Sequence, residues 1–375
     1  MFEKPLTKRF LGASSLLIAT GILICTLWPF QPFPANEVSW LEGSNGIRFD
    51  WAGVVLSSQP LPQASDSVPD SGSASLEIWL KPSNTNDVST VLDFYEPGNS
   101  FRFQIRQYLG GLIVSRDSRT LDGKLKRSKI DLDHGLQRDK LILVTLSSSP
   151  AGTSLYLDGE LKGAYPNFRF ASRDFGGQII LGTSPVDSQP WTGEIRGLAV
   201  YRDALRPLVV QKHYQDWIET RLPVCQGELP TSASAIYTFH ERQGSTIHAT
   251  ERNAPDLEIP AHFSVPHQAF LKTPSAAFET SWPYFADALS NIVGFLPLGV
   301  CLCGYLAFTR PLRWAIFLTV IMGFIYSLGI ESLQAFLPQR VSDFTDVLTD
   351  TLGTAWGALL AGSLKNQGLL GGSKG

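Results

Sequence analysis

Polar residues that could do chemistry stand inside the most apolar part of the chain, between residues 283 and 365. A membrane helix tolerates such groups when they face a partner or a water-filled cavity. Residues three or four positions apart on a helix share one face, and these residues recur at that spacing. We therefore predict one ligand-binding cluster at the outer membrane face, made of Asp287, Asn291, Glu331, Gln334, Arg340, Asp343 and Asp346.

The predicted cluster carries an excess of acid. With Asp350, which continues the last acidic series, five carboxylates accompany one arginine. Either protonation or a bound cation or basic ligand would balance this excess. The same residue types also suit a purely structural network between helices. A hydrolytic site is a third interpretation, because paired carboxylates perform acid–base chemistry, but no nucleophile is evident.

Four apolar segments would position the cluster. They cover residues 10–30, 283–308, 314–329 and 346–364. About 20 apolar residues in a helix span the hydrocarbon core of a bilayer. The last segment is less apolar, but Gly353, Gly357 and Ala361 stand at the small-xxx-small spacing that lets membrane helices approach closely. The first segment is longer than a usual signal-peptide core, which favours an uncleaved anchor.

The basic residues predict the orientation. Lys4, Lys8 and Arg9 precede the first segment, and Arg310 and Arg313 separate the second from the third. Short loops rich in lysine and arginine stay in the cytoplasm. The N-terminus and the tail 366–375 are therefore predicted to be cytoplasmic, and the long stretch before residue 283 extracytoplasmic.

That stretch has the composition of a soluble all-β protein. Short alternating apolar runs are separated by turn residues, as in antiparallel sheets. Predicted strands cover residues 75–82, 89–95, 101–107, 109–116, 140–148, 153–165, 177–182 and 193–205. Asp158-Gly159 predicts a tight hairpin, and residues 206–221 a short helix. A net charge of −3 argues against a nucleic-acid partner.

Single residues of this stretch have ordinary explanations. Trp79, Trp191 and Tyr201 could stack on sugar rings, but core packing is the commoner role of such aromatics. The six histidines show no paired spacing typical of zinc ligands. Cys225 is the only cysteine outside the apolar segments, so it cannot form an intramolecular disulfide there. No cofactor is evident.

The strand sequences resemble a known fold family. EIWLKP, LDFYE, VTLSSSPAGTSLYLDGELKG and WTGEIRGLAVYRDAL are similar to a laminin G-like domain. The resemblance implies a concanavalin A-like jelly roll over residues 35–220, and calcium is a candidate ion in such domains. Residues 221–282 are predicted to be a linker with additional strands of the same sandwich, because 235–249 resembles another opening strand pair.

The apolar ends resemble a second family. IESLQAFLPQRVSDFTDVLTDTLGTAWG and ALSNIVGFLPLG look like the signature of the VanZ-like bacterial membrane proteins, and TLWPF resembles the end of their first helix. Asp350 stands where that pattern more often has Asn. The family is named for a member linked to low-level resistance to the glycopeptide teicoplanin. Residues 1–33 would form its first helix and 283–365 the other three, with the jelly roll inserted between them.

The sequence thus predicts a mixed membrane and soluble protein, with four transmembrane α-helices and an extracytoplasmic all-β concanavalin A-like sandwich. We expect a multi-pass protein of the bacterial plasma membrane. The leading hypothesis is recognition of a glycan, glycopeptide or lipid-linked sugar, affecting glycopeptide susceptibility or surface polysaccharide. Two alternatives are a membrane-anchored module that docks an envelope protein and an enzyme acting on a lipid-linked cell-wall substrate, with Glu331 or Asp346 as general base. The absence of an evident nucleophile favours a binding protein over an enzyme.

Overall fold

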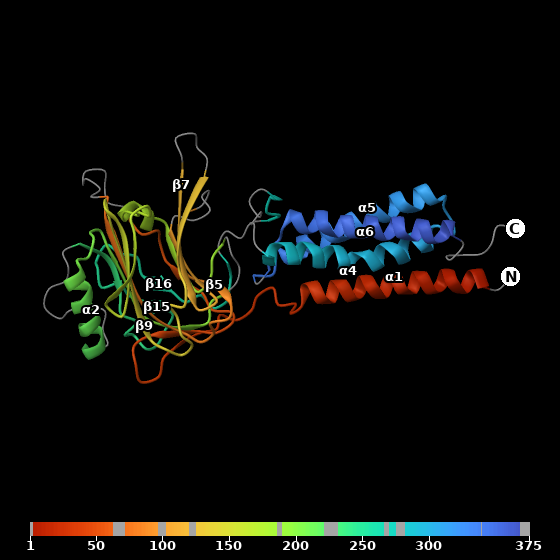
Figure 1. The fold of residues 1–375 in the computed structure, drawn as a ribbon. Coiled ribbons are helices and arrows are strands. Elements are labelled where there is room, and N and C mark those ends of the chain that lie inside the picture. The colour runs from red at the N-terminus through yellow and green to blue at the C-terminus, as the bar shows by residue number, and fades with distance from the viewer. Residues whose placement is uncertain are drawn as a thin grey trace. The chain divides into compact units, whose positions relative to one another are not determined.

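The fold is built from two units that alternate along the chain. A computed structural model describes residues 3–62, 72–96, 103–119, 125–185, 190–220, 232–265, 270–274, 282–338 and 340–367. One unit combines Met1–Pro32 with Gln268–Gly375, and the other is Phe33–His267. Figure 1 shows that the first unit is helical and that the second consists mainly of strands.

Four long helices form the first unit. They are α1 (Glu3–Leu27), α4 (Trp282–Leu306), α5 (Leu312–Gln334) and α6 (Phe344–Asn366). Over the described part of the chain, three segments are long and apolar enough to cross a membrane, namely Thr7–Leu27, Tyr284–Leu306 and Leu312–Gln334. Helix α6 is not among them, because threonines and two aspartates dilute its apolar residues. Three candidate spans are therefore shown, and the fourth stays a prediction.

Helices α4 and α6 pack with their backbones in close approach. A Cβ atom added at Gly299 would lie 2.2 Å from the carbonyl oxygen of Thr354. Cβ atoms added at Gly353 and Gly357 would lie 2.3 Å and 2.1 Å from the carbonyl oxygens of Ile292 and Leu296. Only glycine fits at these three positions, which confirms the close approach predicted from the spacing of Gly353 and Gly357.

The second unit is a sandwich of two antiparallel eight-stranded sheets. The first sheet runs β1 (Val38–Trp40), β2 (Ile47–Phe49), β13 (Gly193–Tyr201), β4 (Ala74–Pro82), β9 (Ile142–Ser149), β10 (Gly152–Leu157) and β11 (Glu160–Tyr165), with β14 (Ala233–Tyr237) also paired to β13. The second runs β15 (Thr246–Ile247), β16 (Leu257–Glu258), β3 (Val55–Ser57), β12 (Gln178–Leu181), β5 (Val88–Tyr95), β6 (Phe103–Tyr108), β7 (Gly111–Arg119) and β8 (Leu125–Leu132). Strands β14 to β16 come from the chain after residue 232, so both sheets are extended by late segments.

Apolar side chains of both sheets form one core. Phe103 is its aromatic centre, with ring centroids 4.9 Å from Phe170 and 5.0 Å from Phe175. The predicted hairpin is confirmed: Asp158 and Gly159 join β10 to β11 with φ angles of 52° and 78°. The Asp158 carboxylate also accepts a hydrogen bond from the Leu143 N–H at 2.9 Å, so its role is to stabilise this hairpin.

The three aromatic residues weighed as sugar platforms are buried. Trp191, Tyr201 and Trp79 are 0%, 1% and 6% exposed, which confirms that they pack within the protein. Trp191 donates a hydrogen bond to Gln107 at 3.0 Å, as a buried indole N–H usually requires. Cys225, by contrast, lies outside the described residues.

Helix α2 (Pro207–Thr220) contacts the first sheet at a buried carboxylate of β4. Glu77 of β4 is fully buried and accepts hydrogen bonds from Tyr201 at 3.0 Å and Thr145 at 3.1 Å. His213 of α2 lies 2.9 Å from the same carboxylate. Burial alone would lower the pKa of His213, but the hydrogen bond and charge of Glu77 outweigh it and raise the pKa above its ordinary value. This contact therefore stabilises the packing of α2 on the first sheet most strongly when His213 is protonated.

Candidate functional site

Helices α4, α5 and α6 bring their polar groups together at the start of α6. We call this set the interhelical network: Asn291, Ser327, Glu331, Asp343, Asp346, Thr349 and Asp350. Asp343 caps α6, because its side chain accepts a hydrogen bond from the Thr345 N–H at 2.7 Å. The Asp343 N–H in turn donates to Glu331 of α5 at 2.8 Å. The cap of one helix is thus tied to a carboxylate of its neighbour, which is itself only 3% exposed.

The contact between α4 and α6 joins an amide to a carboxylate. Asn291 donates to Asp346 at 2.9 Å and lies 3.5 Å from the Thr349 hydroxyl. Asp346 belongs to the first turn of α6, where the positive end of the helix dipole favours an acidic residue. The close approach of α4 and α6 at Gly353 allows this short side-chain contact.

Asp350 lies one turn further into the helices. It is 5% exposed and accepts a hydrogen bond from Ser327 of α5 at 2.7 Å. Its second carboxylate oxygen, Oδ1, is buried and has no hydrogen-bond partner among the described residues. A buried acceptor of this kind is costly unless a donor or a proton satisfies it. Asp350 continues the predicted acidic series but does not belong to the predicted ligand-binding cluster.

Gln334 and Arg340 contact the end of α1. Gln334 donates to the Thr26 carbonyl at 3.1 Å, and Arg340 donates to the Trp28 carbonyl at 2.9 Å. The last carbonyls of a helix have no partner within it, and they form the negative end of its dipole. Both side chains therefore secure α1 beside the loop between α5 and α6.

Asp287 is the candidate least engaged with the rest. It is exposed, and its side chain makes no hydrogen bond to any described residue.

Two contributors were missed by sequence reasoning: Thr349, and Ser342 on the loop before α6. The Ser342 carbonyl accepts a hydrogen bond from the Lys272 N–H at 2.9 Å, which ties the segment ahead of α4 to this loop. Thr349 stands three positions after Asp346, and this helical spacing could have indicated that both side chains share one face. No sequence pattern indicates a role for Ser342.

The network offers mainly hydrogen-bond acceptors. Its side-chain donors are neutral, namely the Asn291 amide and the hydroxyls of Ser327 and Thr349. Such a site can accept hydrogen bonds from the hydroxyls of a sugar or from a cationic group. Among the described residues, no group of three or more His, Cys, Asp or Glu side chains is arranged to hold a metal ion.

An apolar groove of about 570 Å³ lies along α1, α4 and α5. Its lining includes Gly12, Leu16, Leu298, Tyr305 and Met322, with Arg9 at one end. Tyr326 also borders it and donates a hydrogen bond to the Ala19 carbonyl. The groove contacts α1 between residues 9 and 19, whereas Gln334 and Arg340 hold the opposite end of that helix.

Two protein families match this chain. Residues 57–211 match the concanavalin A-like lectin/glucanases superfamily, and residues 233–365 match VanZ/LLP1. The second match includes the late strands β14 to β16 as well as α4, α5 and nearly all of α6. It does not include the first helix, although TLWPF at the end of that helix resembles the same family. No curated protein matches the chain.

Solved structures that resemble part of this chain include receptor-binding domains of botulinum neurotoxins. The domain from neurotoxin D shares 17% identity at a TM-score of 0.35, covering 50% of this chain and 48% of its own. A serotype D ligand-binding domain in complex with N-acetylneuraminic acid shares 16% at 0.35, covering 49% and 45%. This chain therefore spans about half the length of these structures. From the family matches, the chain combines a VanZ/LLP1 family region with a concanavalin A-like, laminin G-like domain.

Proposed function

We propose that this protein recognises a glycan, a glycopeptide or a lipid-linked sugar at the bacterial cell envelope. The sandwich would bind part of the ligand outside the cytoplasm, and the helices would anchor the protein and accept the rest at the interhelical network. Loss of such recognition would alter glycopeptide susceptibility or surface polysaccharide. The observation that carries the proposal is the convergence of polar groups from α4, α5 and α6 at one end of the helices.

The position of the network supports an outward-facing site. Gln334 and Arg340 contact the C-terminal end of α1, from which the chain continues into the sandwich. The segment that returns from the sandwich, around Lys272, pairs with the loop before α6. In the proposed orientation, with four spans and a cytoplasmic N-terminus, this end of the helices faces outward because Arg310 and Arg313 occupy the opposite turn.

The apolar groove along α1, α4 and α5 supports an amphipathic ligand. A hydrocarbon chain buried there would lose contact with lipid but gain contact with Leu16, Leu298 and Met322. The sugar part would meet the hydrogen-bond acceptors of the interhelical network. A lipid-linked sugar has both parts, so it fits the helical unit better than a soluble sugar does.

Binding to the full chain in lipid nanodiscs tests this proposal. The probes are lipid-linked sugars, soluble envelope glycans and glycopeptides, and saturable binding of at least one is expected. Ser327→Ala removes the donor to Asp350 and should weaken binding of a lipid-linked sugar. Ser332→Ala is the matched control on the same helix, because that hydroxyl donates only to the Leu328 carbonyl of α5 itself.

Two results would overturn the proposal. The first is a folded wild-type protein that binds none of the three probe classes. The second is equal binding by the two serine variants and by Asp346→Asn, which would make the network a purely structural contact between helices.

A further inference from the structure

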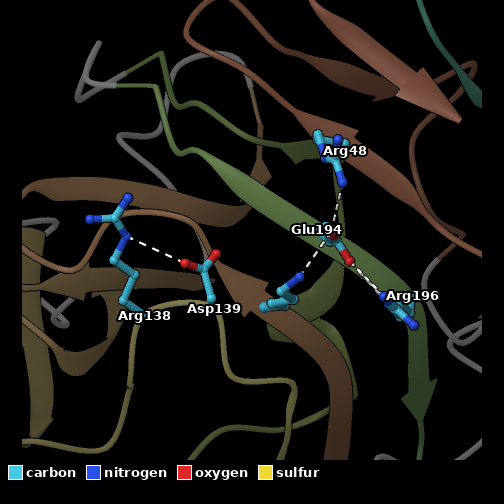
Figure 2. Close-up of polar contacts among 6 residues, drawn as sticks. Arg48, Arg138, Asp139, Glu194 and Arg196 are labelled. Atoms are coloured by element: carbon cyan, nitrogen blue, oxygen red, sulfur yellow. Dashed lines mark hydrogen bonds and ion pairs between the residues drawn. The ribbon is translucent and has the colours of Figure 1, made fainter. Parts of the chain in front are cut away.

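Three cations surround one carboxylate on the outer face of the first sheet. Glu194 of β13 stands in register with Arg48 of β2 on one side and Lys81 of β4 on the other. Arg48 Nη2 and Lys81 Nζ lie 3.0 Å and 3.3 Å from its Oε1 atom, and Arg196 Nη2 lies 2.7 Å from Oε2. Figure 2 shows Arg48 and Arg196 reaching the carboxylate of Glu194, with dashed lines marking the contacts. We call these four residues the cation cluster.

The cluster keeps two positive charges after Glu194 is counted. Burial alone would raise the pKa of Glu194, but hydrogen bonds from Arg196 and Arg48 outweigh it and hold the pKa below its ordinary value. Glu194 is therefore ionised at neutral pH and neutralises one cation. Its own side chain is 5% exposed, whereas that of Arg48 is 50% exposed and that of Lys81 27%. The charge in excess thus faces solvent.

The cations also keep unused hydrogen-bond donors. A guanidinium has five N–H groups and an ammonium three. Arg48 and Lys81 each use one of these groups on Glu194, and both reach the same oxygen atom. Gly46 leaves room for Arg196, since a Cβ atom at this position would lie 3.0 Å from the Arg196 Cγ. Two donors so close together can be bridged by a single tetrahedral anion.

We propose that the cation cluster binds a phosphate or diphosphate group of the envelope ligand. Arg48 and Lys81 would donate directly to the phosphate oxygens, and Arg196 would stay on Glu194 and position it. The site therefore selects ligands that carry a doubly charged anion, such as a sugar phosphate, over neutral glycans. This inference deepens the proposed function and rests on it, because it assigns the charge class of the ligand that the sandwich recognises.

Inorganic pyrophosphate is the probe that tests the cluster separately from the helices. Isothermal titration of the full chain in nanodiscs of neutral lipid should show saturable binding that weakens as salt rises from 0.05 to 0.2 M. Arg48→Gln should weaken this binding about tenfold, as expected for the loss of one charge-assisted hydrogen bond. Arg138→Gln is the matched control, because Arg138 is exposed and already pairs with Asp139 at 3.4 Å (Figure 2).

Glu194→Gln separates ligand binding from a structural role. If the cations serve only to pair with Glu194, this variant loses stability and gains no affinity for pyrophosphate. If the inference is right, removal of the competing carboxylate tightens pyrophosphate binding several-fold. A folded wild-type chain that does not bind pyrophosphate, or equal binding by Arg48→Gln and Arg138→Gln, overturns the inference.

The two proposals fail in different ways. Ser327→Ala should leave pyrophosphate binding unchanged, because Ser327 belongs to the helices. Binding of a lipid-linked sugar that depends on Ser327 but not on Arg48 would refute the phosphate site and retain the proposed function. Pyrophosphate binding that depends on Arg48, with no glycan or lipid-linked sugar bound, would refute the proposed function and the ligand assigned to the cluster with it.

Discussion

Glu331 of the helices and Glu194 of the sandwich are carboxylates of almost equal burial, 3% and 4% exposed, but their partners carry different charge. Glu331 accepts from the uncharged backbone N–H of Asp343, and its acidic neighbours accept from Asn291 and Ser327. Glu194 accepts from two arginines and a lysine. Glu331 thus accepts from a neutral donor, whereas Glu194 accepts from cations whose positive charge is in excess.

The difference follows from what surrounds each site. In a bilayer an unneeded cation would have to be paired or reach water, so neutral donors are the less costly choice for a network between helices. On a sheet face the surplus charge of Arg48 is hydrated. The helical site is therefore suited to ligand hydroxyls or cations and the cation cluster to anions.

The largest effect is expected where the helices touch. Gly299→Ala would place a Cβ atom 2.2 Å from the Thr354 carbonyl oxygen, so α4 and α6 must separate. Overpacking usually costs about 1–3 kcal/mol, and a clash with backbone exceeds that range. We expect most of the monodisperse protein to be lost in size-exclusion chromatography, because the separated helices also lose the Asn291–Asp346 contact. Gly294→Ala is the control on the same helix, because no atom lies within 4 Å of its added Cβ, and it should behave as wild type. Equal loss of monodisperse protein in both variants would show that the close packing of α4 and α6 is not needed for the network.

A buried carboxylate in the sandwich gives the next largest effect. Glu77→Gln removes the charge that holds His213, and breaking a buried pair costs about 3–5 kcal/mol. Because the folded pKa of His213 is raised, its stabilisation is complete below the unfolded pKa of about 6.5 and is lost as pH rises through the folded value. Hydrogen exchange of α2 should therefore accelerate with pH beyond its intrinsic rate in wild type, and this added acceleration should vanish in Glu77→Gln.

Asp256→Asn is the control for that experiment. Asp256 pairs with His248 at 3.0 Å, but both side chains are largely exposed. Its substitution should change neither the exchange of α2 nor its pH dependence. A pH profile of Glu77→Gln that matches wild type would show that His213 does not fasten α2 by charge.

Sequence could predict the features that depend on residues close together in the chain. The apolar segments, the Asp158-Gly159 hairpin and the polar stripe of Glu331 and Gln334 all follow from spacing within one element. Strand β8 (Leu125–Leu132) was missed, because its lysines, arginine and aspartate interrupt any apolar alternation. The polar residues of the last three apolar segments also predicted that these segments meet, since polar groups in lipid have few alternatives to one another.

Sequence could not predict the cation cluster or the buried pair under α2. Arg48 and Glu194 are 146 positions apart, and they meet only because β13 lies between β2 and β4. Glu77 and His213 are 136 positions apart. Such pairs depend on strand order and register, which no local pattern encodes. The same limit applies to Asp287 and Asp350. Both stand at helical spacing from another polar residue of the predicted cluster, but only packing decides that the first is exposed and the second buried.

Ser327→Ala tests the neutral donors of the helices. It removes the donor to Asp350, whose other oxygen has no partner among the described residues, and should cost about 1–3 kcal/mol. Because no ion pair is broken, the loss of melting temperature in nanodiscs should be the same at 0.05 and 0.5 M salt. Ser332→Ala should melt as wild type does. If the loss of melting temperature is smaller at high salt, the network must be ionised and accessible to salt ions, as the cation cluster is.

The smallest effect is expected for Arg48→Gln. Arg48 is half exposed and makes one contact with Glu194, so water already weakens its attraction to the carboxylate. Exposed pairs contribute about 0–1 kcal/mol, and Lys81 and Arg196 remain to satisfy Glu194. Unfolding of the sandwich, followed by hydrogen exchange of β2 and β13, should change little at low salt and not at all at 0.5 M salt. A large, salt-independent loss would mean that Arg48 is needed for folding, and then its charge could no longer be regarded as available to an anionic ligand.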